Sequence, residues 1–253
     1  MNRIGSYENL ETRIVNWLKD YYWMHSGKIK GFVVGVSGGI DSSVVSTLCA
    51  KTKLPTYILT MPLLSKRKNT ELSNAHARAL VDSYSNVTVV NVDLSETYDR
   101  FIDTVYEGFT TNELANANTK SRLRMVTLYQ IAGSVGGIVV GTGNKVEDYG
   151  IGFYTKYGDG GVDVAPIADL YKTEVWELGK HLGVDERIIN APPTDGLWDD
   201  GRSDEDQIGV SYSELEEAME NGTGPAVKIL KKFNKQNKHK MEPIPTFKLE
   251  KLS

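Results

Sequence analysis

Four short apolar runs that alternate with helical stretches constrain the fold of this 253-residue chain more than any other feature. The runs span residues 31–36, 56–59, 87–92 and 137–141, and they are typical of strands covered on both faces. Apolar spacing predicts helices over 7–25, 42–52, 69–84, 94–107 and 112–134. Strands that alternate with helices favour right-handed βαβ crossovers. The sequence therefore predicts an α/β fold with a doubly wound parallel sheet, helices on both faces and a ligand at the carboxyl ends of the strands.

The pattern changes after residue 150. Loops rich in glycine and acids, 158–163 and 195–206, separate helices predicted over 171–182, 211–220 and 223–237. The last of these stretches carries many lysines, which a solvated helix face with an apolar stripe would explain. Because α/β chains of about 250 residues often form one unit, we expect a single domain over 1–253 with a helical segment from about 191.

Composition excludes several classes of protein. The 29 Lys+Arg against 33 Asp+Glu give a net charge of −4, which argues against a dedicated nucleic-acid binder. The lone Cys49 allows no intrachain disulfide, and we expect it to be buried in the core. The sequence shows neither a signal peptide nor an apolar run of roughly 20 residues. These features predict a cytoplasmic protein with no membrane contact.

A glycine- and serine-rich segment, 35–43, directly follows the first predicted strand and precedes a helix. Glycines allow a close backbone approach, and the N-terminus of the helix suits a phosphate. Asp41 would repel a phosphate unless a Mg²⁺ ion lay between them. No lysine of a Walker A loop is present, and the glycine spacing does not match a dinucleotide fingerprint. The structural alternative is a strand-to-helix turn in which Asp41 caps the helix.

The stretch Ser37-Gly38-Gly39-Ile40-Asp41-Ser42 resembles the SGGxDS loop of the ATP pyrophosphatases, which cleave ATP between its α and β phosphates. NAD synthetase, GMP synthetase, asparagine synthetase and tRNA-modifying enzymes share this loop. Later segments resemble NAD synthetase in particular, namely 122–125, 141–147, 153–163, 191–194 and 239–240. This resemblance covers about residues 5–245 and implies a Rossmann-like fold of the adenine nucleotide alpha hydrolase type.

The resemblance also implies a role for individual residues. Mg²⁺ would bind Asp41 and Glu147, and these two residues with Lys172 would be catalytic. Glu147 follows the strand end at Gly141, so it can face the first loop across the sheet. The residues expected to bind ATP are Gly35, Val36, Ser37, Gly38, Gly39, Ile40, Asp41, Ser42, Thr142, Lys172 and Thr194. The residues expected to bind deamido-NAD are Arg122, Lys156, Asp163, His239 and Lys240.

One segment departs from the family pattern. Gly143-Asn144-Lys145 stands where many relatives carry an Asp-His-Ala type segment, and 148–152 is about one residue longer than in the shorter relatives. The resemblance therefore does not predict the course of the chain between Thr142 and Glu147.

The implied reaction has two steps, in which ATP adenylates the nicotinate carboxylate and ammonia then displaces AMP. Glutamine-dependent relatives carry an additional amidase domain, for which 253 residues leave no room, so ammonia is the expected nitrogen source. The family also implies a homodimer, and the many apolar residues of 112–134 favour one. Two alternatives stay open: an ATP pyrophosphatase that acts on tRNA, which would want a basic face and further cysteines, and a nucleotide sensor of the universal-stress type, which would need no paired acids.

The segment 196–210 contains five acids among glycines, so it has little to bury and is expected to be mobile. Since it follows Thr194, it could close over bound nucleotides and exclude water from the adenylate. An acidic surface loop without a gating role is the alternative.

Overall fold

A four-stranded parallel sheet forms the centre of the computed structural model, which describes residues 3–25, 27–64, 67–106, 108, 112–194 and 203–249. The strands are β1 (Phe32–Gly35), β2 (Thr56–Thr60), β3 (Val87–Asn91) and β4 (Ile138–Val139), in the order β3-β2-β1-β4. Phe32 of β1 pairs with Thr56 on one side and with Ile138 on the other. All four predicted strands are confirmed, although β4 is only two residues long.

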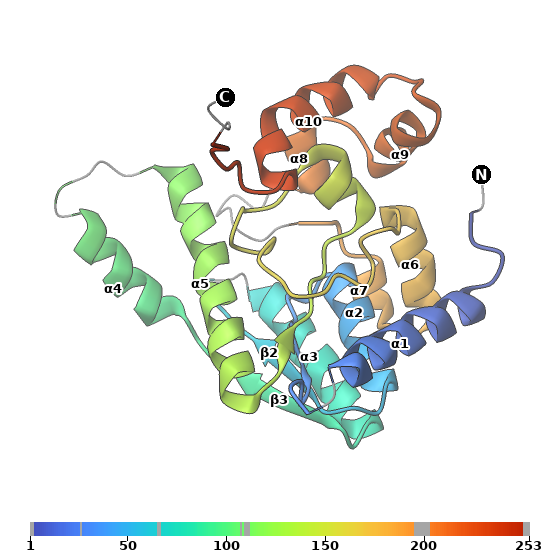
Figure 1. Cartoon of the computed structure of the whole chain (residues 1–253), viewed down its shortest axis with the longest axis vertical. Helices are drawn as coiled ribbons and strands as arrows, with labels where there is room; N and C mark the ends of the chain where they lie inside the picture. Colours follow the sequence, from blue (N-terminus) through green and yellow to red (C-terminus); the bar gives the residue numbers. More distant parts are fainter. Residues whose placement is uncertain are drawn as a thin grey trace.

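Helices cover both faces of the sheet, so the doubly wound α/β prediction is confirmed (Figure 1). On one face lie α1 (Tyr7–Met24), α2 (Ile40–Lys51), α3 (Arg67–Ser83) and α6 (Lys172–His181). On the other face lie α4 (Ser95–Tyr106) and α5 (Glu113–Val135). Alternate residues of β1 enter different cores, since Phe32 and Val34 face α1 and α2 while Val33 faces α5.

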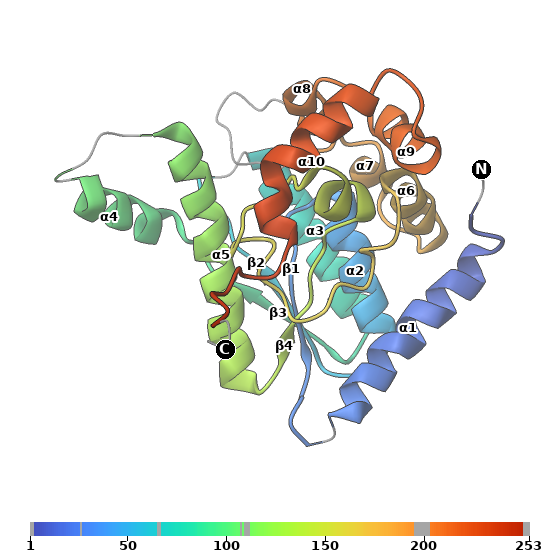
Figure 2. The same cartoon turned by 45° about the horizontal axis from the view of Figure 1, so that its top comes forward.

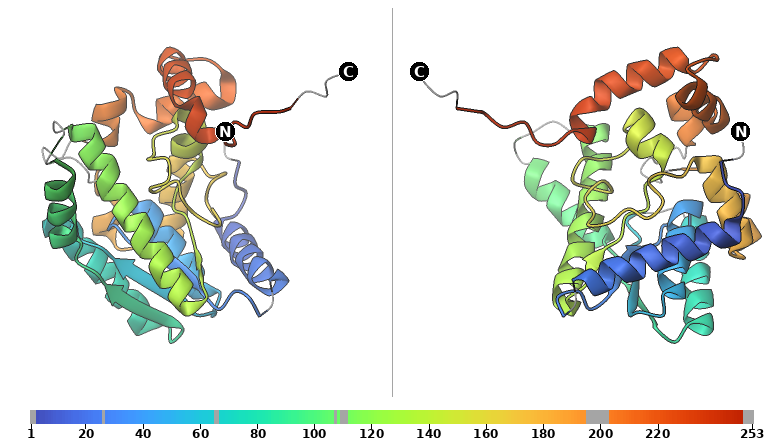
Figure 3. Two further views of the ribbon diagram at one scale, coloured as in Figure 1. Left: turned by 60° about the vertical axis from the view of Figure 1, so that its left-hand side comes forward. Right: turned by 45° about the vertical axis from the view of Figure 1, so that its right-hand side comes forward.

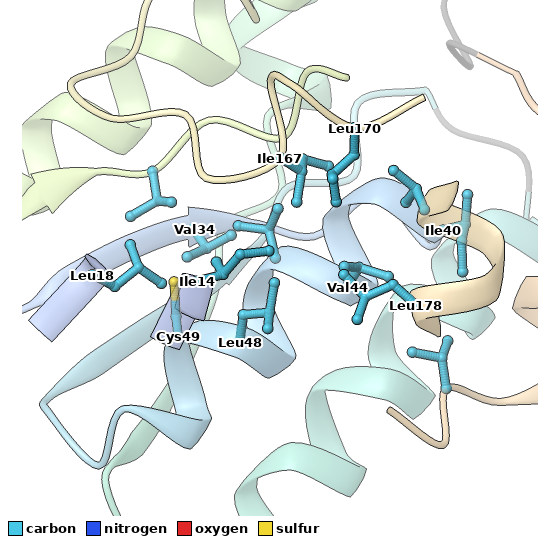
Figure 4. Close-up of a cluster of buried hydrophobic side chains, with 14 of the residues drawn as sticks. Ile14, Leu18, Val34, Ile40, Val44, Leu48, Cys49, Ile167, Leu170 and Leu178 are labelled. Atoms are coloured by element: carbon cyan, nitrogen blue, oxygen red, sulfur yellow. The ribbon is translucent and has the colours of Figure 1, made fainter. Parts of the chain in front are cut away.

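The larger core lies between β1, α1, α2 and α6 (Figure 4). Cys49 of α2 is completely buried in it, as predicted, and burial raises the pKa of its thiol. Helix ends follow from local chemistry. The Ser6 hydroxyl accepts a hydrogen bond from the Asn9 N–H at the start of α1, and Gly136, with φ of 69°, ends α5.

The C-terminal part forms a separate cluster at one end of the molecule (Figure 2). It contains a π-helical segment, η1 (Val146–Ile151), with α8 (Asp204–Ile208), α9 (Tyr212–Asn221) and α10 (Val227–Met241). The short helix α7 (Glu186–Ile189) follows α6. Patterning predicted α9 and α10, but not η1, α7 or α8, which are too short to show a periodic apolar stripe. After α10, the chain extends away from the body in both views of Figure 3.

The lysine-rich face of α10 is solvated as predicted, with Lys228, Lys231, Lys232, Lys235 and Lys238 all exposed. Lys240 is the exception and is half-buried. Among the helices of the described residues, none is long and apolar enough to cross a membrane.

A buried histidine of α3 predicts that the stability of the fold depends on pH. His76 lies with its Nε2 3.0 Å from the Ser46 hydroxyl of α2, and burial lowers its pKa from 6.5 to about 4, against smaller opposing effects of a hydrogen bond to the Ser43 backbone and of Asp185. Between these values the unfolded chain binds a proton that the folded chain does not, so stability falls as the pH falls. We expect His76 to account for a loss of about 2 kcal/mol in the free energy of unfolding between pH 7 and pH 5.

Urea unfolding of the wild type and of His76→Gln at both pH values tests this expectation. The variant should show a correspondingly smaller loss on acidification, because glutamine does not titrate. Equal losses in the two proteins would show that His76 does not carry the effect.

Candidate active site

The glycine- and serine-rich loop lies at the carboxyl end of β1, where the chain turns into α2. The Ser37 and Ser42 hydroxyl oxygens are 3.1 Å apart, and the Gly39 N–H donates to the Ser37 oxygen at 3.2 Å. Gly38 has φ of 88°, and a Cβ there would lie 2.7 Å from the Asn69 carbonyl oxygen of α3. No side chain larger than hydrogen fits this turn. The loop therefore presents backbone and hydroxyl groups at the start of a twelve-residue helix.

Three charged side chains from three elements meet beside this loop. Lys172 Nζ, at the start of α6, lies 2.5 Å from Asp41 Oδ2 of α2 and 2.9 Å from Glu147 Oε1 of η1. The Lys172 side chain is 3% exposed and the two carboxylates are each 16% exposed. Glu147 thus faces the first loop across the sheet, as expected from its place after β4. The alternative in which Asp41 caps the helix is wrong, because Gly39 is the N-cap and the Asp41 carboxylate is bound to Lys172.

Local hydrogen bonds hold the segments that carry these three side chains. Asn144 donates from its side-chain nitrogen to Asp41 Oδ1 at 3.2 Å, while its side-chain oxygen accepts the N–H groups of Val146 and Glu147. One asparagine therefore joins the start of η1 to the start of α2. The first turn of α6 is held by Glu174, whose carboxylate accepts the Tyr171 N–H and pairs with Arg3.

The charges of the three groups depend on one another. Burial and the nearby Glu147 raise the pKa of Asp41, against the opposing effect of Lys172. Burial alone would raise the pKa of Glu147, but the Lys172 charge and hydrogen bonds from Lys172 and Tyr212 lower it below its ordinary value. Burial would lower the pKa of Lys172, but both carboxylates raise it. Lys172 is therefore a permanent cation shared between two carboxylates.

The oxygen donors of this cluster suit a hard divalent cation. Mg²⁺ in nucleotide sites takes one or two carboxylates and completes its shell with phosphate oxygens and water. Asp41 and Glu147 are such a pair, and they flank a loop shaped for phosphate. Across the described residues, no group of three or more His, Cys, Asp or Glu side chains could hold a metal ion. The residues present fit a cation that arrives with a phosphate better than a metal held by protein ligands alone.

Three of the five residues predicted to bind the second substrate are linked by hydrogen bonds, and a fourth, Lys240, follows the last of them in the chain. The Arg122 guanidinium of α5 donates to the Lys156 carbonyl at 3.3 Å, and Lys156 Nζ donates to the His239 carbonyl of α10 at 2.7 Å. Lys240 Nζ donates to the carbonyls of Gly152 and Tyr154, and burial lowers its pKa. The structure thus brings these four residues together from α5, the 153–163 loop and α10.

Asp163 has different partners. Its Oδ2 accepts the Val139 N–H of β4 at 2.8 Å, and its Oδ1 accepts the Tyr129 hydroxyl at 3.1 Å. The carboxylate therefore ties the 153–163 loop to β4 and α5 in this structure. Its contact with deamido-NAD stays a prediction.

The two threonines predicted to bind ATP occupy different surroundings. Thr142 is half-buried and follows the bridge between Val140 and Val164, at the carboxyl edge of the sheet. Thr194 is exposed and is the last described residue before 203. Their contacts with ATP stay predictions.

The predicted mobile segment 196–210 is only partly visible, because 196–202 lie outside the described residues. Its second half differs from the expectation. α8 is capped by Ser203, whose hydroxyl accepts the Asp206 N–H, and both Asp204 and Ile208 are buried. Residues 203–208 therefore form a capped helix with a buried face, whereas their composition predicted little burial.

Several residues of the site were not predicted from the sequence. Tyr212 donates its hydroxyl to Glu147 Oε1 at 2.7 Å and lies with its ring 5.0 Å from Lys172 Nζ. Asp148 lies beside Gly143, where an added Cβ would meet its carboxylate, and burial with the nearby Glu147 raises its pKa to about 8. Asn144 lies within the 141–147 segment that resembles NAD synthetase, so this segment could have identified it as a site residue. Tyr212 carried no signal, since a tyrosine in an apolar helix stripe is ordinary core.

Together, the fold and the site define a class of protein: an α/β nucleotide-binding protein with a phosphate loop and paired carboxylates at the carboxyl edge of its sheet. The family model described as NAD synthase matches residues 10–246. The NH(3)-dependent NAD(+) synthetase of Finegoldia magna is 38% identical over 97% of this chain and 98% of its own. The chain therefore belongs to the NAD synthase family.

Solved structures agree with this assignment. The NMN synthetase from Francisella tularensis superposes with a TM-score of 0.87 at 32% identity, covering 97% of this chain and 100% of the other. The NH3-dependent NAD synthetase from Campylobacter jejuni superposes with a TM-score of 0.77 at 25% identity, covering 96% and 100%. Both matches extend over nearly the whole chain, so the similarity includes the C-terminal cluster as well as the sheet.

Proposed function

We propose that this chain catalyses the ATP-dependent amidation of deamido-NAD by ammonia, which gives NAD, AMP and pyrophosphate. The observation that carries the proposal is the Asp41–Lys172–Glu147 cluster beside the phosphate loop in a chain of the NAD synthase family. A nicotinate carboxylate oxygen attacks the α-phosphorus of ATP, and the bond to the bridging oxygen of pyrophosphate breaks. Ammonia then attacks the carbonyl carbon, AMP leaves with the oxygen, and the nitrogen loses a proton.

In this proposal the loop 35–42 binds the ATP phosphates, with Thr142 and Thr194 as further hydroxyl donors. Asp41 and Glu147 would hold Mg²⁺, which when bound neutralises phosphate charge as pyrophosphate leaves. The Lys172 ammonium lies between the two carboxylates at the end of a long side chain, so in this proposal it transfers its positive charge from them to the phosphates as negative charge develops.

Arg122, Lys156 and Lys240, with His239 and Asp163, would bind deamido-NAD. A dinucleotide with two phosphates and a carboxylate needs several positive charges, and this region supplies three permanent ones. The NH(3)-dependent NAD(+) synthetase of Finegoldia magna supports ammonia as the nitrogen source, because this chain matches 98% of the length of that enzyme. A cytoplasmic location stays a prediction.

A second substrate is favoured by one observation, the TM-score of 0.87 against an NMN synthetase. Nicotinate mononucleotide carries the same carboxylate as deamido-NAD but lacks the adenylyl half. The decisive experiment measures AMP and pyrophosphate release with ammonium and either substrate. We expect product with deamido-NAD and a kcat/KM at least tenfold lower with nicotinate mononucleotide.

The same assay separates the remaining alternatives. Glutamine in place of ammonium should support little activity, and AMP release that depends on tRNA would indicate a tRNA-adenylating enzyme. ATP binding without any AMP release, and unaffected by Glu147→Ala, would indicate a nucleotide sensor and refute the proposed reaction.

We also infer a homodimer. On the face away from the core, α4 and α5 expose Phe101, Val105, Leu114 and Val126, each between 40% and 59%. Exposed apolar side chains on neighbouring helices are typical of a subunit interface. An obligate interface of this kind would bury more than roughly 2,000 Å² in total.

Sedimentation velocity at micromolar concentration should show the dimer, and Val126→Glu should weaken it by placing a charge in the interface. Val81→Glu is the matched control, because Val81 is also exposed but lies on α3. A stable, active wild-type monomer, or equal effects of the two variants, would contradict the predicted interface.

A further inference from the structure

Tyr212 of α9 donates a hydrogen bond from the C-terminal cluster of helices to the Asp41–Lys172–Glu147 cluster. It is 1% exposed, and its hydroxyl lies 2.7 Å from Glu147 Oε1 and 3.2 Å from Asp204 Oδ2 of α8. A phenol has one hydrogen, so it cannot donate fully to both carboxylates at once. The shorter distance assigns that hydrogen to Glu147.

The tyrosine ring is held independently of its hydroxyl. Its plane meets the Trp176 ring edge-on at 84°, with the ring centroids 6.1 Å apart. The ring belongs to the apolar cluster that joins η1 to α9 and α10. The hydroxyl therefore has a fixed position, set by packing, relative to the segment that carries Glu147.

Lys172 and Tyr212 both donate to the same oxygen of Glu147, Oε1. These two donors differ in mobility, since Lys172 has a long flexible stem and, in the proposed function, follows the phosphates. Tyr212 has a rigid, enclosed ring. When Lys172 moves away from Glu147 toward the phosphates, the Tyr212 hydroxyl still donates to the carboxylate and keeps it oriented.

We propose that Tyr212 is a positioning residue for the metal site: its hydroxyl holds Glu147 Oε1, so that Oε2 is presented to the divalent cation. This inference rests on the proposed function, in which Glu147 is a metal ligand. Hydrogen-bond donors that orient a metal-binding carboxylate commonly change metal affinity by 10–100-fold when removed. α9 thus contributes to a site whose two proposed ligands lie on α2 and η1.

The test is Mn²⁺ binding, followed by electron paramagnetic resonance in the presence of α,β-methylene-ATP, which is not cleaved between the α and β phosphates. Tyr212→Phe keeps the ring and removes only the hydroxyl, so we expect the Mn²⁺ dissociation constant to rise on the order of tenfold. Tyr84→Phe is the matched control, because Tyr84 packs in the core beside α3, near the start of β3. Its dissociation constant should stay within twofold of the wild-type value.

A double variant establishes whether Tyr212 acts through Glu147. If it does, Tyr212→Phe combined with Glu147→Gln should bind Mn²⁺ no more weakly than Glu147→Gln alone. An unchanged Mn²⁺ affinity in Tyr212→Phe, or losses that add in the double variant, would overturn the positioning role. If Glu147→Gln alone has no effect on Mn²⁺ affinity, the metal assignment itself fails, and the role of Tyr212 fails with it.

Discussion

Replacing Lys172 with methionine is expected to lower the free energy of unfolding by about 3–5 kcal/mol. The Lys172 ammonium is nearly completely buried and lies within 2.9 Å of both Asp41 and Glu147. Without it, two carboxylates stay buried side by side with no positive charge between them. Added Mg²⁺ should recover part of this loss if both carboxylates are its ligands. Urea unfolding at neutral pH, with and without Mg²⁺, measures both effects.

Lys180→Met is the matched control for this experiment. Lys180 lies on the same helix, α6, and pairs with Glu177, but both side chains are more than half exposed. An exposed pair of this kind contributes about 0–1 kcal/mol. If Lys172→Met is no less stable than Lys180→Met, Lys172 does not neutralise the two buried carboxylates.

Asp41→Asn and Glu147→Gln should each lower kcat/KM about a thousandfold, which corresponds to roughly 4 kcal/mol of transition-state stabilisation. Each variant keeps the size of the side chain and removes its charge, so phosphate charge would be left without a metal held in place. High Mg²⁺ should partly restore the activity of either single variant but not of the double variant. The measurement is the rate of AMP release across a range of Mg²⁺ concentrations.

Asp169→Asn serves as the control, since Asp169 also pairs with a lysine but has an 89% exposed side chain. It should retain nearly full activity. Near wild-type activity of Asp41→Asn or Glu147→Gln at low Mg²⁺ would show that the residue concerned is not a metal ligand.

The central sheet could be predicted well because a strand covered on both faces leaves an unbroken apolar run. The runs at 31–36 and 56–59 became β1 and β2 within a residue or two. η1 was missed for the opposite reason, since Val146–Ile151 places only two buried apolar side chains among polar ones and glycine. Its conformation depends on Asn144 and on packing against α9 and α10, which no local pattern records.

For the site, the motifs identified Asp41, Glu147 and Lys172 but not their relation to one another. A lysine at a helix start is usually solvated, whereas Lys172 is buried. The difference arises because η1 brings Glu147 within 2.9 Å of the ammonium, so that two carboxylates offset the free-energy cost of its desolvation. Tyr212 is the clearest omission, because its role follows from where α9 docks and not from its neighbours in sequence.

The sequence by itself determined the alternation of strands and helices, the phosphate loop and its carboxylate, and the family resemblance. These depend on interactions within a few residues, or on burial common to a whole strand, and both leave a local pattern. Only the tertiary structure decided the strand order, the sharing of Lys172 between Asp41 and Glu147, and the contact of Tyr212 with Glu147. Each of these joins residues at least 24 positions apart in the chain. Their energies arise from excluding water around charges that different elements bring together, so they exist only once the elements have packed.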